Sequence, residues 1–274
     1  MNMRGYVAAF CHEQATDPYS GEPLFKCMIE ELSQSVEPTL KVNAPIGTVL
    51  PGHRTVDVAG VRYLLDDLLP PDTYYGEPCA LNWRAWAAAE DVGLLDVAGA
   101  VVGAAGTRLY AAPQPAGQDQ DRVTESVPYQ RYQFRLPPTA SAEPGALLRS
   151  KDRLYLAVAV FEQDGLLVVE ADELRRNARA RVQYGADTVY DPISDAYSAQ
   201  AVEADGLRMA RALRYAVANV SADPAAPGDQ TWYFLPAQIA GCKTGDAFTA
   251  EGARWRVVSA SRQSGVWVAH CRPV

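Results

Sequence analysis

Two stretches of this chain that lie 100 residues apart carry the same pattern, and this match constrains the fold most. Residues 145–172 and 245–272 each read as two strands that meet at a turn near a glycine, Gly165 or Gly265. The positions that agree in residue type are Gly145 and Gly245, Tyr155 and Trp255, Val158 and Val258, Gly165 and Gly265, and Val168 and Val268. At the same offset the match extends back to Gln130 and Gln230 without an insertion. Duplication of one hairpin unit and a chance likeness of two hairpins both account for this pattern.

The first strand differs in polarity between the two copies. Residues 154–161 (LYLAVAVF) are all apolar, which is typical of a strand buried on both faces. Residues 254–261 (RWRVVSAS) alternate, with Trp255 and Val257 on one face and Arg254 and Arg256 on the other. We therefore expect the first copy to be internal framework and the second copy to lie at a surface or a subunit contact.

The N-terminal part mixes strand and helix signals. Residues 56–59 and 61–65 predict a hairpin at Gly60, and GVRYLL there resembles GARWRVV at Gly252, so a third copy of the unit is one interpretation. Apolar spacing predicts a short helix over residues 24–32, and alanine content predicts another over residues 81–89. Residues 205–220 fit a third helix, with strand as the alternative for their last third, and residues 94–110 fit a helix or a buried strand.

Residues 111–121 (AAPQPAGQDQD) have almost nothing to bury and are typical of a linker or a long exposed loop. They divide the chain into an N-terminal α+β domain (residues 1–112) and a β-rich domain (residues 122–274) that contains both hairpin units. The fold class expected is α+β but mainly β: small antiparallel β-barrel or sandwich units with a few peripheral helices.

Composition excludes some classes of protein. The chain has 274 residues, 48% of them hydrophobic, which is enough for a substantial core. A net charge of −8 argues against wrapping nucleic acid through phosphate contacts. The cysteines are odd in number and widely spaced, so reduced, buried thiols are expected: Cys11, Cys27, Cys79, Cys242 and Cys271. No apolar run is long enough for a membrane helix.

No motif for nucleotide binding, serine hydrolysis or zinc-dependent hydrolysis is present, so we expect no enzyme activity, no catalytic residue, no cofactor and no metal. Two groups of residues are weaker candidates for a metal site. Cys11–His12 and His270–Cys271 place adjacent side chains on opposite faces of a strand, which is poor chelating geometry. Asp187, Asp191 and Asp195 stand four apart, but Pro192 interrupts them.

Several residues could contact a partner instead. Trp83 and Trp86 would share one helix face, although such a pair is more often part of a core. Arginines cluster near residue 175, where a solvated face is the plainer interpretation. The candidate partner contacts are Trp83, Trp86, Arg175, Arg176, Arg179, Trp255, Arg256 and Trp267.

The ending GDAFTAEGARWRVVSASRQSGVWVAHCR resembles the C-terminal strands of head–tail joining and head-closure (stopper-like) proteins of tailed bacteriophages. The resemblance covers about 30 residues and consists of glycine, aromatic and valine positions. It implies a structural virion protein that assembles in the host cytoplasm as a homo-oligomeric ring or connector between head and tail. Its partners would be itself and neighbouring virion proteins, with DNA as weakly held, passing cargo and no membrane contact. This chain is over twice as long as one such unit.

Three other functions fit the sequence. A tail-tip or minor capsid protein would share the β-rich composition. A soluble monomeric adaptor would use the tryptophan pair, Trp83 and Trp86, against one protein partner. A metal-dependent enzyme would need the aspartates near residue 191 or the Cys–His pairs.

Overall fold

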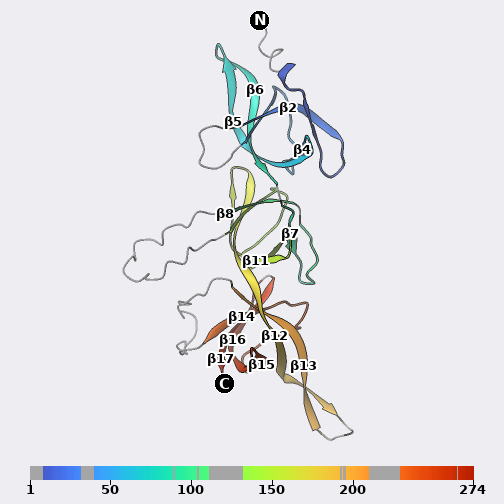
Figure 1. Cartoon of the computed structure of the whole chain (residues 1–274), viewed down its shortest axis with the longest axis vertical. Coiled ribbons are helices and arrows are strands. Elements are labelled where there is room, and N and C mark those ends of the chain that lie inside the picture. The colour runs from blue at the N-terminus through green and yellow to red at the C-terminus, as the bar shows by residue number, and fades with distance from the viewer. Residues whose placement is uncertain are drawn as a thin grey trace, which may run out of the picture.

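The computed structural model describes residues 9–31, 40–88, 90–103, 105–110, 132–191, 193, 196–209, 229–263 and 265–274. In this part of the chain the fold is all-β with essentially no helix. The barrel prediction is confirmed in its antiparallel β-barrel form, whereas the predicted α+β class with peripheral helices is wrong. The strands form an N-terminal barrel, a middle half-barrel and a nearly closed C-terminal barrel that follow one another along the molecule (Figure 1).

Six strands close the N-terminal barrel in the order β1-β2-β3-β6-β5-β4. They are β1 (Glu13–Thr16), β2 (Pro23–Glu31), β3 (Leu40–Pro45), β4 (Thr55–Val58), β5 (Val61–Tyr74) and β6 (Glu77–Ala87). The hairpin predicted at Gly60 is confirmed as β4–β5, with Val58 opposite Val61.

The middle half-barrel and the C-terminal barrel share one 26-residue strand, β12 (Leu166–Asp191). The half-barrel contains β7 (Val92–Leu95), β8 (Thr107–Tyr110), β9 (Tyr132–Leu136), β10 (Leu147–Ser150), β11 (Arg153–Gln163) and the first part of β12. The C-terminal barrel contains β13 (Ala196–Met209), β14 (Gln230–Phe234), β15 (Ala247–Ala250), β16 (Ala253–Gln263) and β17 (Val266–Pro273), and the second part of β12 pairs with β13 and β15. A strand of this length spans about 85 Å, so it acts as a spine through both units.

All three predicted helices are strands or lie partly outside the described residues. Residues 24–32 fall mostly in β2, residues 81–87 belong to β6, and residues 205–209 end β13, while residues 210–220 are not described. The i, i+3 spacing of the two tryptophans in residues 81–89 suggested a helix face, but β6 is a strand that is buried on both faces. Trp83 points into the barrel core, and Trp86 points outward against the half-barrel, so both appear apolar without a helix.

The two hairpin units have the same strand register. In the first, Tyr155 pairs with Leu148 of β10 and Glu173 of β12; in the second, Trp255 pairs with Phe248 of β15 and Pro273 of β17. Both long strands carry a bulge at the same point, between Ala157 and Ala159 and between Val257 and Ser259. The 100-residue offset therefore holds through β10, β11 and the start of β12.

Upstream of these strands the offset changes to 98. Phe134 of β9 pairs with Val169, whereas the residue that pairs with Ala269 is Trp232 of β14. The predicted alignment without an insertion is wrong here, because the β14–β15 connection is two residues longer than the β9–β10 connection. The corrected alignment makes core aromatics equivalent. Phe134 contacts Tyr155 edge-on at 4.9 Å between ring centroids, and Trp232 contacts Trp255 edge-on at 5.6 Å.

The N-terminal barrel repeats this arrangement at an offset of 192 from the last copy. Thr55 pairs with Leu64 as Ala247 pairs with Arg256. The backbone N–H of Leu65 donates to the Arg54 carbonyl at 2.8 Å, as the Val257 N–H donates to the Asp246 carbonyl. Tyr63 takes the place of Tyr155 and Trp255 in the core. One β-unit thus occurs three times in the structure, and common ancestry of the three copies stays a prediction.

The expected contrast between the two hairpin copies is confirmed only in the first part of the strand, where Leu156 is 3% exposed and its equivalent Arg256 is exposed. Val158 and Phe161 of β11 are each 39% exposed, so this all-apolar strand is not covered on both faces. Beyond that part the two strands are alike, and β11 and β16 both end in three exposed residues.

β7 and β8 precede the predicted linker at residues 111–121, and β10 and β9 follow it. β7 pairs with β10 and β8 pairs with β9, so the segment connects two strands of one sheet. The linker itself lies outside the described residues.

Candidate assembly surfaces

The turn between β11 and β12 docks on the N-terminal barrel. The backbone N–H of Asp67 donates to the Asp164 carbonyl at 2.7 Å. The Arg54 guanidinium forms an ion pair with Asp67 at 2.7 Å and lies over the turn. Gly165 has φ +75°, and a Cβ there would lie 2.4 Å from both Arg54 Nη1 and Asp67 Oδ1. This contact therefore needs glycine in the turn.

An apolar and polar cluster lies beneath that turn. Leu166 packs against Leu64 and Trp86. The Trp86 Nε1–H donates to Asp66 Oδ2 at 3.1 Å, and the Arg135 guanidinium lies 4.1 Å above the Trp86 ring. Burial raises the pKa of Asp66, and the hydrogen bonds from Trp86 and the Asp67 N–H act against that rise.

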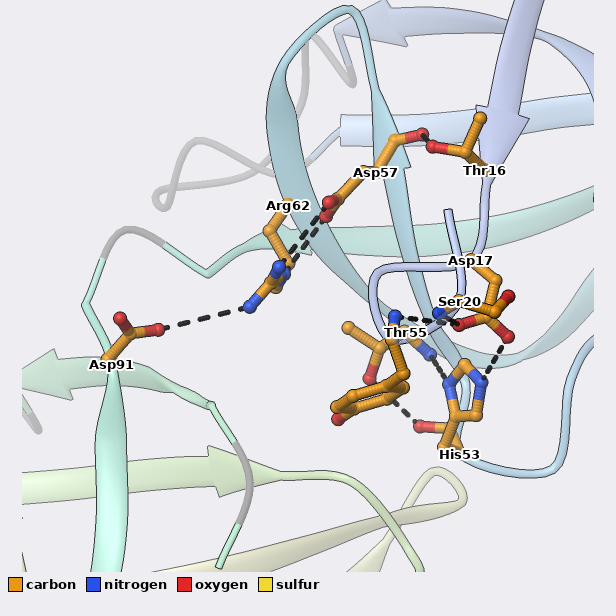
Figure 2. A network of polar contacts seen from close by, with 9 residues as sticks. Thr16, Asp17, Ser20, His53, Thr55, Asp57, Arg62 and Asp91 are labelled. Carbon is orange, nitrogen blue, oxygen red and sulfur yellow. Dashed lines mark hydrogen bonds and ion pairs between the residues drawn. The ribbon is translucent and has the colours of Figure 1, made fainter. Parts of the chain in front are cut away.

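A polar network braces the same side of the N-terminal barrel (Figure 2). Asp17 accepts the backbone N–H groups of Tyr19 and Ser20 at 2.8 and 3.1 Å and contacts His53 Nε2 at 3.1 Å. The Thr55 N–H donates to His53 Nδ1, so this nitrogen carries no hydrogen and Nε2 is the donor to Asp17. The bond from the Tyr19 N–H is the main reason that the pKa of Asp17 is lowered.

Arg62 carries this network toward the half-barrel. Its Nε donates to Asp57 Oδ1 at 3.0 Å, and its Nη1 lies 4.0 Å from Asp91, which directly precedes β7 (Figure 2). The bond to Asp57 is the largest cause of the raised pKa of Arg62. Every member is held by a structural bond, so the network fits a brace between units better than a reaction centre.

The turn between β16 and β17 docks on the half-barrel in the same way. The Gly265 N–H donates to the Gly145 carbonyl at 2.9 Å, and a Cβ at Gly265 would lie 2.9 Å from Leu147 Cγ. Val266 joins a buried cluster that includes Leu147 and Leu156 on the half-barrel, together with Leu174, Leu207 and Tyr233.

The two junctions use equivalent residues. By strand register Leu64 corresponds to Leu156, and Leu166 corresponds to Val266. Each junction thus places the first residue after a hairpin turn against the outward-facing residue of the preceding unit's long strand. The molecule repeats one mode of head-to-tail contact between its units.

An open cleft of about 610 Å³ borders the first junction. Arg54, Asp67 and Trp83 line it from the N-terminal barrel, and Glu162 and Gly165 line it from the half-barrel. Arg54 and Asp67 already satisfy each other, so the cleft presents no unpaired charge from that ion pair to a ligand.

The predicted partner residues fall in different places. Trp83, Trp86 and Trp255 are only 4–6% exposed, so their rings offer almost no surface to a partner. Trp267 is half-buried, with the Arg262 guanidinium 5.2 Å from its ring centre. Arg256 is exposed on β16. The chain therefore does not bring these five residues together.

The arginine cluster lies on β12. Arg175 is opposite Arg208, Arg176 is opposite Leu207, and Arg179 is opposite Asp205 of β13. The side chains of these three arginines lie outside the described residues. Their place in the central ladder of the spine was not visible in the sequence, because nothing local predicts a 26-residue strand.

The cysteines are free and buried. Burial raises the pKa values of Cys27 and Cys242 to about 12 and also raises those of Cys11 and Cys271. A buried thiol of this kind stays protonated and is a poor nucleophile. The described residues contain no group of three or more His, Cys, Asp or Glu side chains placed to hold a metal ion. The side chains of Asp187, Asp191 and Asp195 lie outside that part of the structure.

Two hairpins project from the stacked units (Figure 1). β5 and β6 extend past the N-terminal barrel to a turn at Tyr75–Gly76, and Tyr75 is 91% exposed. β12 and β13 extend past the C-terminal barrel at the opposite end, where Ile193 is 95% exposed. Reasoning from the sequence missed the first arm. Its signal was the Tyr-Gly pair after an apolar stretch, which is a turn signature.

No protein-family model matches the chain, and no similar protein was found among curated proteins or among solved structures. In the described part of the chain, no helix is both long and apolar enough to cross a membrane.

Proposed function

We propose that this chain is a non-enzymatic structural subunit that assembles with copies of itself and with neighbouring proteins in a tailed-phage particle, as part of the connector between head and tail. The observation that carries the proposal is the β12–β13 ribbon. β15 pairs with β12 only as far as Gln183, yet β12 and β13 continue to pair from Thr188–Ala199 to Asp191–Ala196. Among the described residues no third strand pairs with this part of the ribbon. A two-stranded ribbon is marginally stable by itself, so such an arm fits insertion against another protein.

Charge supports the same proposal. The chain carries a net charge of −8, and its arginine cluster lies on β12 in the ladder with β13, where Arg179 is opposite Asp205. Such a subunit suits a channel wall along which DNA passes without being retained.

The monomeric adaptor is less well supported. That interpretation needs Trp83 and Trp86 on a common surface, but they lie on opposite faces of β6 and are buried in two different clusters. A tail-tip or minor capsid position remains a variant of the same structural proposal.

The test replaces the ribbon tip, residues 186–197, with an Asn-Gly turn. The unaltered chain is expected in the particle, and particles assembled without it should lose DNA or fail to join tails. The ribbon-deleted chain should fold but fail to enter particles, whereas a Val49→Ser control at an exposed site of the N-terminal barrel should enter normally. Particles without the chain that retain DNA and join tails normally would refute the proposal.

A further inference from the structure

The two internal junctions show how one unit of this chain covers the next, and each end of the molecule carries half of such a junction. At the N-terminal end, the β5–β6 turn (Tyr75–Gly76) is the equivalent of the two turns that form the internal junctions. The strand register shows this, because each turn is closed by a pair at the same place: Tyr74 with Glu77, Gln163 with Leu166, and Gln263 with Val266. Within the described residues no β-unit precedes the N-terminal barrel, so the β5–β6 turn has no preceding unit of the kind that receives the other two turns (Figure 1).

At the other end, the face of the C-terminal barrel that would receive a turn is uncovered. Gly145 is buried beneath Gly265, but its equivalent Gly245 is exposed, and no heavy atom lies within 4 Å of the position of a Cβ there. Leu154 and Leu156 pack against the C-terminal barrel, and their equivalents Arg254 and Arg256 are exposed.

The residues at the two ends of the molecule differ in charge from those at the internal junctions. Leu64 meets Leu166, and Leu156 meets Val266. At the two ends the corresponding positions are Arg256 and Glu77, which are opposite in charge. Arg62, the equivalent of Arg254, already reaches the acid Asp91 of the following unit at 4.0 Å.

We propose that the β5–β6 arm of one copy docks on the Arg254–Arg256 face of the C-terminal barrel of a second copy, which repeats the internal junction between molecules. This contact is heterologous, so copies join head to tail in a closed ring or an open filament. The inference rests on the proposed function, since it names which surfaces of the assembly subunit meet.

The arm is longer than the internal hairpins. It runs ten residues from Leu65 to Tyr74, against seven from Val257 to Gln263. The internal junctions are also held by the covalent chain, which gives a high effective concentration. A contact between molecules lacks that advantage, and an arm about 10 Å longer supplies more contact area. Asp72 of the arm is paired with Lys41 at 3.2 Å inside the N-terminal barrel, so the exposed Glu77 is the acid that meets the basic face, which also includes the exposed Lys243.

Cross-linking tests this contact in the full chain. The native cysteines are buried, so a short bis-maleimide should react mainly with introduced thiols. A mixture of Tyr75→Cys and Arg256→Cys chains should give a cross-linked dimer. Tyr75→Cys mixed with Val102→Cys, at an exposed site on the side of the half-barrel, should give at least tenfold less.

Charge reversal gives a second readout. Arg256→Glu should weaken association at least tenfold, and Glu77→Arg in the same chain should restore it, because close charge pairs at interfaces are strongly coupled. Arg149→Glu, an exposed site on β10, is the matched control and should have no effect. Equal cross-linking in both mixtures, or no rescue by the double reversal, would overturn the inference. If the chain enters particles but these results fail, the inference is refuted and the structural function stands.

Discussion

Replacing Trp86 by phenylalanine tests how the first junction is held. The change keeps a ring between Leu166 and Arg135 but removes the Nε1–H that donates to Asp66 at 3.1 Å. Asp66 is 2% exposed, so loss of a donor leaves a buried carboxylate with fewer bonds. That loss should reduce the free energy of unfolding by about 1–3 kcal/mol at neutral pH.

The size of this loss should depend on pH with a definite sign. The pKa of Asp66 is raised by burial, so its charged form destabilises the folded chain. Protonation of Asp66 removes that cost as the pH falls through its raised folded pKa toward its ordinary value, near 3.8. The difference between the Trp86→Phe chain and the unaltered chain should therefore shrink between neutral pH and that value.

Urea unfolding followed by circular dichroism at several pH values measures both effects. Trp83→Phe is the matched control, because it makes the same change in the same barrel and its indole nitrogen has no hydrogen-bond partner among the described residues. An equal loss from both variants, or a Trp86→Phe loss that grows as the pH falls, would refute the reasoning about this junction.

Three further results are expected. Gly265→Ala should lower the free energy of unfolding by about 1–3 kcal/mol, since its Cβ would lie 3.0 Å from the Leu147 backbone nitrogen. Gly241→Ala is the control and should leave that free energy unchanged, because a Cβ there meets open space. Equal urea midpoints for the two variants would contradict this. Glu90→Gln should destabilise the half-barrel at neutral pH, because the hydrogen bond from Ser150 is the main reason that the pKa of Glu90 is lowered. The stability that ionised Glu90 contributes is present above its ordinary pKa of 4.5 and is lost as the pH falls through the lowered folded pKa. Thermal melts of the two chains that differ equally at pH 7 and pH 3 would argue against this. A thiol reagent should modify no cysteine of the folded chain, since all five are buried, and rapid reaction without denaturant would contradict the packing of the barrel cores.

The sequence predicted the repeated hairpins because their glycines and core aromatics fall at fixed positions. Gly165 and Gly265 are needed where turns approach the preceding unit, and Tyr155 and Trp255 fill equivalent places in two cores. The third copy was harder to see, since Tyr63 and Gly60 are the main matching positions and its hairpin is longer.

The sequence failed where one strand is buried on two sides. Trp83 and Trp86 appeared to share a helix face because one faces the barrel core and the other faces the next unit. The same cause hid the junctions. Leu64 and Leu156 look like ordinary strand residues, and only the stacking of units shows that they face a neighbour. The equivalent Arg256 was predicted as a contact from its alternation, and its exposure fits that prediction without testing it.

The measurement that tests the central claim most directly is the solution mass of the full chain by sedimentation velocity across a range of concentrations. One chain has a mass of 29.7 kDa. An assembly subunit that joins head to tail should show a series of multiples of that mass that shifts to smaller species with added salt. A single 29.7 kDa species at every concentration would contradict self-association.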